Sequence, residues 1–300
     1  MTRLAGRLVL VLLGWAFAAD QALAARLTGS FTTLAPGLEI AEGTAAVGDA
    51  EVPLTLVRVD PARYGVRVAT SADLAAPPER RAAAGGGTLR EYFERLGAAA
   101  VLAGGLVASF EPLKPLGLVV SDGRVVSPPH RTWASSGLFC TGPEGASIRP
   151  FDPSATPTGE GIDCLQSGPL LVGPDGVASG ERLRRSVGID YTRDFVEGRH
   201  GRAFVALDRR GRVLLGVTGP LDLPRLAEVL AAAAEPAVLD IAAALNLTGA
   251  WTAGLLVRAG EVEVRAGDPD GVALPTAIAV LPPEIPGPSR AAAGRRDPDG

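Results

Sequence analysis

Short apolar runs separated by turn-forming residues constrain the fold of this chain most strongly. Each run has the length of a strand, and Gly, Pro, Asp or Asn residues that favour turns lie between the runs. The clearest runs are residues 52–59, 64–70, 98–102, 116–120, 202–207, 213–217 and 254–258. This pattern predicts a mixed α/β fold that is rich in strands, with a largely antiparallel sheet core and a few covering helices in a single compact domain.

Turn residues between neighbouring runs predict three antiparallel hairpins. The first joins residues 52–59 to 64–70 through the turn 60–63, and the second surrounds the strong turn pair Asp122-Gly123. The third joins 202–207 to 213–217. Residues 128–163 contain Pro, Gly, Ser and Thr throughout, so we expect mostly loop there, and a long irregular excursion is usually functional or disordered.

Two segments have the spacing of helices. Thr88 and Glu91 have the positions of a capping box, which predicts a short helix from Thr88 through Leu96. Residues 222–234 are rich in Ala and Leu at helical spacing. Residues 238–244 are expected to continue that helix, ahead of a short buried strand at 245–247.

The first 24 residues have the order of a secretory signal peptide. Arg3 and Arg7 precede a short apolar run, and Ala22-Leu23-Ala24 provides small residues for a signal peptidase. We therefore expect cleavage after Ala24 and a periplasmic or secreted protein with no membrane span in the mature chain. Residues 25–281 then form the domain, and the Pro/Gly/Arg-rich tail 282–300 is expected to be disordered.

The charge of the mature chain argues against a nucleic-acid partner. Without Arg3, Arg7 and Asp20, the 29 basic and 33 acidic residues become 27 and 32, a formal net charge of −5. Nucleic-acid binding requires a basic face, which this composition does not favour. The sequence gives no indication of the oligomeric state.

Two cysteines, Cys140 and Cys164, both lie in the mature part of the chain. An even pair in an exported protein favours one disulfide over two free buried thiols. His130 and His200 are the only histidines and show no ligand spacing, so we expect no metal site and no cofactor.

A polar turn and a pair of arginines suggest a binding site for an anion. Gln166, Ser167 and Gly168 precede the apolar run 170–172. A strand over that run would therefore present an amide, a hydroxyl and backbone N–H groups at its start. Arg184 and Arg185 precede a second short apolar run. Guanidinium groups beside neutral donors suit an anionic ligand. The alternative is two ordinary strands with solvated charges at their ends, and most surface arginines are of that kind.

Five places in the chain, taken in order, resemble the phosphodiester glycosidase domain, the module of the mannose 6-phosphate uncovering enzyme and of many secreted bacterial proteins. The order and spacing of these places are more specific than any one of them. They are Val57 to Pro61 with Tyr64; Val101 to Gly105 with Pro115 to Gly123; Gln166 to Val172; Arg184 to Gly188; and Asn246 to Leu255. Gly104 and Gly105 follow the buried run 98–102, where glycines let the backbone approach a ligand closely or merely permit a tight turn. The resemblance implies that Arg184 to Gly188 are the family's arginine followed by a valine-glycine strand.

The chain departs from the family at two polar positions of the cleft. The family's asparagine before the paired glycines is Ala103 here, and the aspartate of its Leu-Asp-Gly-Gly motif is Thr248. A threonine hydroxyl has no basicity near neutral pH. Losing a general base typically removes about 10²–10⁴ in rate. Asp190, Asp163 and Glu111 are candidates for a substitute carboxylate, although each is more simply a charge at a strand end or in a loop.

The resemblance implies hydrolysis of a sugar 1-phosphodiester, with a sugar-phosphate or envelope glycan as ligand. In this interpretation Arg184, with Arg185 beside it, holds the phosphate, and Gln166 and Ser167 orient its oxygens. Trp251, and also Trp133, has an aromatic face that suits a pyranose ring, while core packing explains either equally well. The departures leave two hypotheses open: an exported glycosidase with a repositioned base, or a non-catalytic protein that binds glycan phosphodiesters or a partner in the cell envelope.

Overall fold

The computed structural model describes residues 26–28, 30–47, 50–74, 85–131, 135–187, 192–232 and 239–283. The expected signal peptide, the tail from residue 284 and most of the connection 75–87 lie outside these ranges. Strands dominate the described part of the chain, and every strand pair in it is antiparallel. The strand-rich mixed α/β fold expected from the sequence is therefore confirmed.

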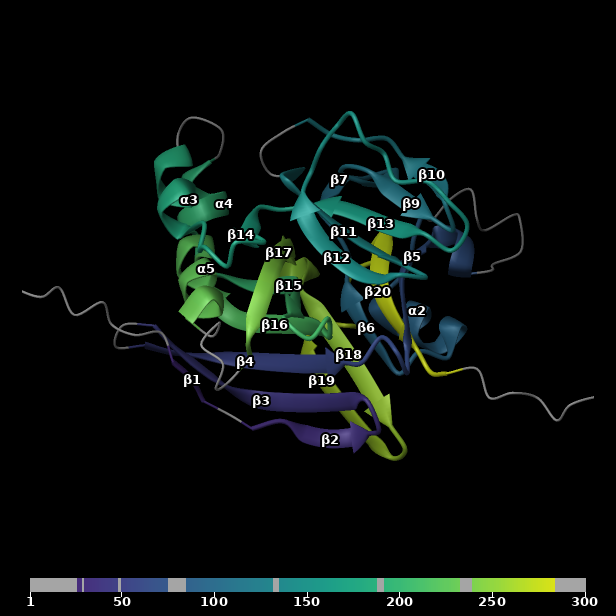
Figure 1. Ribbon diagram of the computed structural model, residues 1–300, viewed down its shortest axis with the longest axis horizontal. Helices are drawn as coiled ribbons and strands as arrows, with labels where there is room; N and C mark the ends of the chain where they lie inside the picture. Colours follow the sequence, from purple (N-terminus) through teal and green to yellow (C-terminus); the bar gives the residue numbers. More distant parts are fainter. Residues whose placement is uncertain are drawn as a thin grey trace, which may run out of the picture.

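The large sheet contains eight strands in the order β1-β3-β4-β16-β15-β17-β14, with β2 paired to β3 (Figure 1). These strands are β1 Arg26–Thr28, β2 Thr32–Ala35, β3 Leu38–Val47, β4 Ala50–Val59, β14 Leu170–Val172, β15 His200–Asp208, β16 Val213–Leu221 and β17 Ile241–Gly249.

Two five-stranded sheets and one ribbon complete the strand framework. The disulfide sheet has the order β10-β9-β13-β11-β12, and the C-terminal sheet has the order β19-β18-β6-β20-β5. The disulfide sheet comprises β9 Val119–Ser121, β10 Arg124–Ser127, β11 Gly137–Gly142, β12 Gly145–Pro150 and β13 Asp163–Ser167. The C-terminal sheet comprises β5 Gly65–Thr70, β6 Ala100–Ala103, β18 Gly254–Ala259, β19 Val262–Gly267 and β20 Thr276–Leu281, and the ribbon comprises β7 Val107–Phe110 and β8 Leu113–Pro115.

Three helices cover one face of the large sheet: α3 Gly180–Ser186, α4 Arg193–Glu197 and α5 Leu223–Ala232 (Figure 1). Alternation along β15 explains how both faces are buried. Phe204 and Ala206 pack in the cluster that contains α3, α4 and α5, whereas Ala203 and Val205 pack in the cluster shared with the other two sheets. The large sheet is thus a middle layer between helices and strands.

The predicted helices are largely confirmed. Helix α2 covers Leu89–Leu96, and Thr88 and Glu91 form the expected capping box by exchanging side-chain and backbone hydrogen bonds. Helix α5 corresponds to the segment 222–234. The continuation expected over 238–244 is wrong: Ile241 begins β17, because this apolar segment pairs with the equally buried β15. Two short 3₁₀ turns lie at Ser71–Leu74 and Ala250–Thr252.

Two of the three predicted hairpins are confirmed, β9 with β10 and β15 with β16. The first is wrong, because β4 pairs with β3 and β16 in the large sheet, while β5 pairs with β20 in the C-terminal sheet. The turn after β4 carries the chain from one sheet to another. The loop expected over 128–163 is also wrong in its middle, where β11 and β12 form a hairpin.

A disulfide joins Cys140 of β11 to Cys164 of β13, as the sequence led us to expect. The two residues are direct partners in the register of the disulfide sheet, and the bond closes a loop with a sequence separation of 24. Such a loop is expected to stabilise the fold by about 3 kcal/mol, chiefly by restricting the unfolded chain.

Reduction of this disulfide is therefore expected to lower the free energy of unfolding by about 3 kcal/mol. The measurement is denaturant unfolding with and without a reductant, and a Cys140→Ser/Cys164→Ser variant serves as the control because its unfolding should not respond to the reductant. An unchanged unfolding midpoint after verified reduction would contradict the prediction.

Candidate functional site

A pocket of about 550 Å³ lies at one edge of the large sheet, where β15 begins and β17 ends. Antiparallel pairing places Arg202 opposite Gly249 and Ala203 opposite Thr248, so both strands contribute side chains to the same hollow. The remaining wall comes from α4, from the ribbon β7–β8 and from the 3₁₀ turn 250–252. Asp194, His200 and Arg202 are the titratable residues that line it within the described part of the chain.

Arg202 supplies a buried cation to this pocket. Its side chain is almost fully buried, and it donates through Nε to the Leu221 carbonyl at 3.1 Å and through Nη2 to the carbonyls of Phe195 and Gly198 at 3.2 and 2.8 Å. Nη1 has no hydrogen-bond partner, and no carboxylate lies within 4 Å of the guanidinium, among the described residues. Burial lowers the pKa of Arg202 to about 10, while the negative charges of Asp222 and Asp194 act in the opposite direction. The group is therefore positively charged at neutral pH and keeps a free donor.

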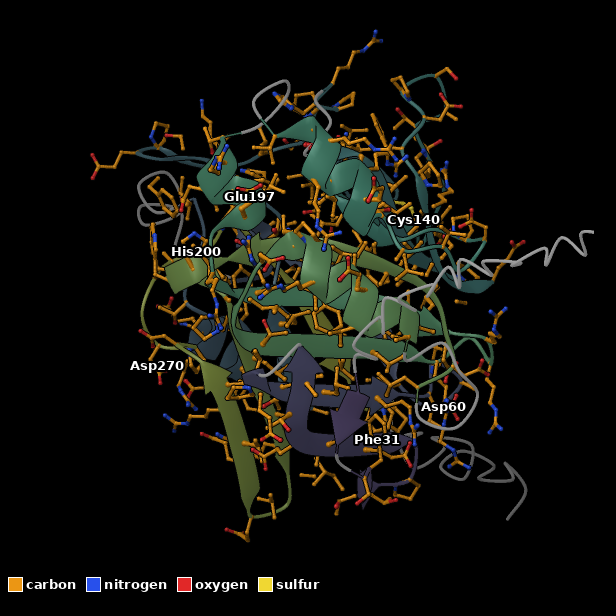
Figure 2. All side chains as sticks on the ribbon, turned by 90° about the vertical axis from the view of Figure 1, so that its left-hand side faces the viewer. Phe31, Asp60, Cys140, Glu197, His200 and Asp270 are labelled. Carbon is orange, nitrogen blue, oxygen red and sulfur yellow. A yellow bond between two sulfur atoms is a disulfide. The ribbon has the colours of Figure 1, made fainter. Side chains whose placement is uncertain are left out.

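His200 and Asp194 form a pair in the same wall. The Nε2 atom of His200 lies 3.2 Å from Oδ1 of Asp194, and the two side chains are 32% and 82% exposed. Figure 2 labels His200 at the start of β15, next to Glu197 at the end of α4. The pair thus links the short helix to the strand that carries Arg202.

The hydroxyl groups of Thr248 and Thr252 meet inside the pocket, with 2.5 Å between their Oγ1 atoms. Thr252 also donates to the Gly249 carbonyl at 2.6 Å. Both threonines are buried. The position at which the resemblance places an aspartate therefore holds a neutral hydroxyl that is engaged by another hydroxyl.

Two exposed aromatic side chains form the rim of the pocket. The rings of Phe110 and Trp251 lie 4.8 Å apart between centroids, and the residues are 41% and 60% exposed. Exposing two large rings together is costly in water, so such a rim suits an apolar sugar face or another flat ligand. Trp251 lies at the position foreseen beside Thr248.

Gln166 and Ser167 are buried and hold other parts of the fold. Oε1 of Gln166 accepts from the backbone N–H groups of Leu118 and His130, and its Nε2 donates to the carbonyls of His130 and Ser135. Ser167 donates to the Leu247 carbonyl at 2.9 Å, directly before Thr248. Both residues lie in β13, not in the turn expected from the sequence. They fix the loops and strands around the pocket, and neither lines it.

The glycines expected near the ligand make close backbone contacts. A Cβ on Gly104 would lie 2.2 Å from Oγ1 of Thr276, and one on Gly105 would lie 3.2 Å from the Leu165 side chain. The carbonyl of Gly168 accepts from Nδ2 of Asn246 at 2.8 Å. The absence of a side chain at Gly104 thus allows the backbone to pack on β20, immediately before the segment that enters the pocket wall.

Arg184 and Arg185 lie in the last turn of helix α3, and most of the short apolar run after them, for which a strand was expected, lies outside the described residues. Their segment buries Leu183 and Ser186 three positions apart, which is helical spacing. Nη2 of Arg184 pairs with Glu228 of α5 at 2.6 Å, and Arg185 lies 3.6 Å from Glu181 on the exposed surface. Neither arginine lines the pocket that contains Thr248. Asp190 and Trp133 lie outside the described residues.

Arg202, His200, Asp194 and Phe110 are the pocket residues that sequence reasoning missed. A signal for Arg202 was present, because it begins a run that we predicted as a strand. We predicted an arginine followed by an apolar strand at residues 184–188. In the structure, Arg202 and the apolar residues of β15 that follow it have this arrangement.

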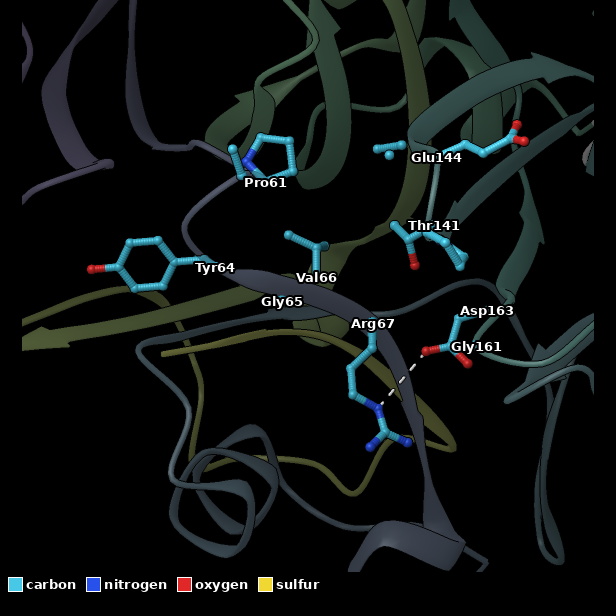
Figure 3. A pocket seen from close by; sticks show the side chains of 14 residues that line it. Pro61, Tyr64, Gly65, Val66, Arg67, Thr141, Glu144, Gly161 and Asp163 are labelled. Atoms are coloured by element: carbon cyan, nitrogen blue, oxygen red, sulfur yellow. Dashed lines mark ion pairs between the residues drawn. The ribbon is translucent and has the colours of Figure 1, made fainter. Parts of the chain in front are cut away.

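A second pocket, of about 440 Å³, lies between β5 and the hairpin β11–β12 (Figure 3). Arg67 and Asp163 face each other there with 3.8 Å between Nε and Oδ2, and Arg67 also pairs with Asp73 at 2.7 Å. Burial raises the pKa of Asp163, although two backbone N–H groups donate to it. Asp163, one candidate for the substitute carboxylate, therefore lies in a different pocket from Thr248.

No group of three or more His, Cys, Asp or Glu side chains in the described residues is arranged to hold a metal ion. None of the helices in the same ranges is long and apolar enough to cross a membrane.

Comparison with solved structures shows the same fold in three proteins of low sequence identity. A hypothetical protein from Synechocystis has a TM-score of 0.61 at 14% identity, over 85% of this chain and 64% of its own length. The catalytic domain of zebrafish N-acetylglucosamine-1-phosphodiester alpha-N-acetylglucosaminidase, auto-inhibited by its pro-peptide, gives 0.58 at 15% identity, over 86% of this chain and 88% of its own. A Burkholderia pseudomallei K96243 protein named "Putative exported protein" gives 0.54 at 14% identity, over 77% and 74%. No curated protein matches the chain in sequence.

The fold and the pocket together define a strand-rich domain with a recessed cationic cavity and an aromatic rim. The model of one family, described as phosphodiester glycosidase, matches residues 96–281, which include both strands of the pocket. The chain belongs to the phosphodiester glycosidase family.

Proposed function

We propose that this protein acts on sugar 1-phosphodiesters of envelope glycans, in the pocket between β15 and β17. The observation that carries the proposal is the buried guanidinium of Arg202. It has no carboxylate within 4 Å and no hydrogen-bond partner for Nη1 among the described residues, and it lines the same cavity as Trp251. A buried cation without a counter-ion favours an anionic ligand, and the aromatic rim favours a sugar next to that anion.

The chemistry follows from the bond that is cut. Water attacks the anomeric carbon, the bond from that carbon to the phosphate oxygen breaks, and the phosphomonoester leaves. A phosphate is a good leaving group, so a cation that stabilises its charge and a group that activates water are the main requirements. Arg202 provides the first.

The roles expected of Arg184 and Arg185 stay predictions. Arg184 already pairs with Glu228, and neither residue lines the pocket, so Arg202 is the better-placed cation. We propose a supporting role for Gln166, Ser167 and Gly168, which hold the loops and the β17 strand on which the pocket depends.

The alternative function is non-catalytic binding of a glycan phosphodiester or of an envelope partner. The observation that favours it is the bonded pair of Thr248 and Thr252, which leaves a neutral hydroxyl where the resemblance implies an acid. A threonine at this position also adds no negative charge beside Arg202, on which only the more distant carboxylates of Asp222 and Asp194 act among the described residues.

We also propose that the protein is exported and that residues 25–281 form its functional domain. The disulfide supports export, because such bonds persist in oxidising compartments. The signal-peptide pattern of residues 1–24 supports the same location. Mass spectrometry of the protein recovered from a periplasmic extract would show whether the mature chain begins after Ala24.

The function is tested by incubating purified protein with UDP-N-acetylglucosamine and with a nitrophenyl sugar phosphodiester. We expect release of free sugar together with UDP from the first substrate and nitrophenyl phosphate from the second, and saturable binding that changes the fluorescence of Trp251 at the rim. A Trp251→Phe variant should lose the fluorescence change, and Trp251→Ala should raise KM about two- to twelvefold, since such ring contacts contribute about 0.5–1.5 kcal/mol. Saturable binding without turnover would establish the alternative, and absence of both would overturn the proposal.

A further inference from the structure

The pair formed by His200 and Asp194 offers proton chemistry in a pocket that has lost its expected acid. Only two histidines occur in the sequence, His130 and His200, and His200 is the one that lines the pocket with Thr248 and Arg202. Histidine changes charge near neutral pH and is the side chain most often used as a general acid or base.

The local structure fixes this pair. Asp194 lies in the first turn of α4, which Thr192 caps by accepting from the Phe195 N–H group at 3.3 Å. Nη2 of Arg202 donates to the carbonyls of Phe195 and Gly198, so one guanidinium binds the end of α4 to the strand that carries His200. The cation of the pocket therefore also holds the pair in place.

Gly198 permits the close approach of the two side chains. A Cβ at this position would lie 2.1 Å from the Asp194 carbonyl and 2.5 Å from Nε2 of His200. The backbone φ of Gly198 is −62°, which any residue can adopt, so the glycine is required for space and not for conformation. The imidazole of His200 occupies space that a side chain at position 198 would fill.

Resting on the proposed function, we propose that His200 is the general base of the reaction and replaces the acid that is absent at Thr248. Nε2 of His200 faces Asp194, which leaves Nδ1 as the ring nitrogen that takes the proton. A water molecule loses its proton to Nδ1 while its oxygen forms a bond to the anomeric carbon. The bond between that carbon and the phosphate oxygen breaks, its electron pair leaves with the phosphomonoester beside Arg202, and the imidazolium returns the proton to solvent. Asp194 is a positioning residue that stabilises the imidazolium.

Charges from three elements act on this pair. Asp194 belongs to α4, Arg202 belongs to β15, and Asp222 directly precedes α5 and interacts with Arg202. Asp194 is the carboxylate that faces Nε2 of His200, and Arg202 is the cation in the same pocket wall.

The test is a set of variants assayed with UDP-N-acetylglucosamine. His200→Gln should lower kcat by about 10²–10⁴ with KM changed less than about threefold. Wild-type activity should fall as the pH drops below neutrality, and that acid limb should disappear in His200→Gln. Asp194→Asn should lower kcat less than His200→Gln does and should alter the acid limb. The matched control is His130→Gln, which removes the other histidine and should leave kcat unchanged.

A second measurement does not depend on activity. The ring proton resonances of the two histidines can be assigned with His130→Gln, and N-acetylglucosamine 1-phosphate should shift the His200 resonance on binding. Gly198→Ala should reduce kcat as His200→Gln does, because the added Cβ displaces the ring.

The outcomes separate the two proposals. Turnover in the wild type that survives His200→Gln within about threefold overturns the role of His200 and leaves the function intact. Binding of the sugar phosphate without any turnover also overturns it. Absence of both binding and turnover overturns the proposed function itself.

Discussion

Replacement of Arg202 with glutamine is expected to lower kcat/KM for a sugar 1-phosphodiester by about 10²–10³. Arg202 is the buried cation of the pocket, and its Nη1 donor has no partner among the described residues. A charge that develops on the leaving phosphate is stabilised more strongly in such a site than in water, because the surroundings are dry and already organised. Glutamine keeps a donor and some of the side-chain length while it removes the charge. Steady-state kinetics measure the effect on turnover, and titration with N-acetylglucosamine 1-phosphate measures the effect on binding.

Two further variants distinguish lost catalysis from lost structure. Arg202→Lys retains the charge and loses the planar fork that contacts three carbonyls, so we expect an intermediate activity. Arg184→Ala removes an exposed ion pair with Glu228 and should change kcat/KM less than about twofold. Thermal unfolding of each variant shows whether the fold persists. Equal losses in Arg184→Ala and Arg202→Gln would contradict the assignment of the cation to Arg202.

Local signals in the sequence predicted local structure well. The capping box at Thr88 and Glu91 defines a helix start through hydrogen bonds within one turn, and Asp122-Gly123 defines a tight hairpin in the same way. The disulfide was predictable from the number of cysteines and the expected compartment. Each of these predictions depends on residues whose interaction needs no knowledge of the rest of the chain.

Pairing between distant strands could not be predicted in this way. Strand β4 has a turn directly after it, yet it pairs with β3 and with β16, which lies more than a hundred residues further along the chain. Turn residues permit a hairpin, and they equally permit a change of sheet. Which of the two forms depends on whether another strand offers a better matched apolar face, and that competition is not visible in either strand alone.

In the candidate site, too, neighbours in the sequence were predictable and contacts between distant strands were not. Thr248 and Trp251 were predicted together because they are neighbours in the sequence. Arg202 reaches the pocket only through the register of β15 on β17, which places it opposite Gly249. Arg184, the arginine chosen from the sequence, also precedes a short apolar stretch, but it lies on helix α3 and pairs with Glu228, which the sequence pattern alone does not indicate. Neighbours in the sequence therefore indicated one strand of the candidate pocket, whereas the contribution of the partner strand depends on register.

Replacement of Thr248 with aspartate is expected to restore a general base at the end of β17, so in a His200→Gln background it should raise kcat by about 10²–10⁴, the factor that a general base contributes. The substitution places a carboxylate at the end of β17, opposite the strand that carries Arg202, and Thr252 can donate its hydroxyl hydrogen to the new acid instead of to the Gly249 carbonyl. Arg202 supplies the counter-charge that a buried carboxylate needs. The new carboxylate also competes with the phosphate for that guanidinium, so KM should rise.

The matched control is Thr248→Asn, which has the same shape and no basicity. Combination with His200→Gln then connects this prediction to the proposed base: a Thr248→Asp/His200→Gln protein should retain the added activity, because the acid no longer depends on the imidazole. Equal activity of Thr248→Asp and Thr248→Asn would show that a carboxylate has no catalytic use at this position. In that case any turnover depends on His200 alone, and saturable binding without turnover in the wild type would show that the buried cation and the aromatic rim hold a ligand that the protein does not cleave.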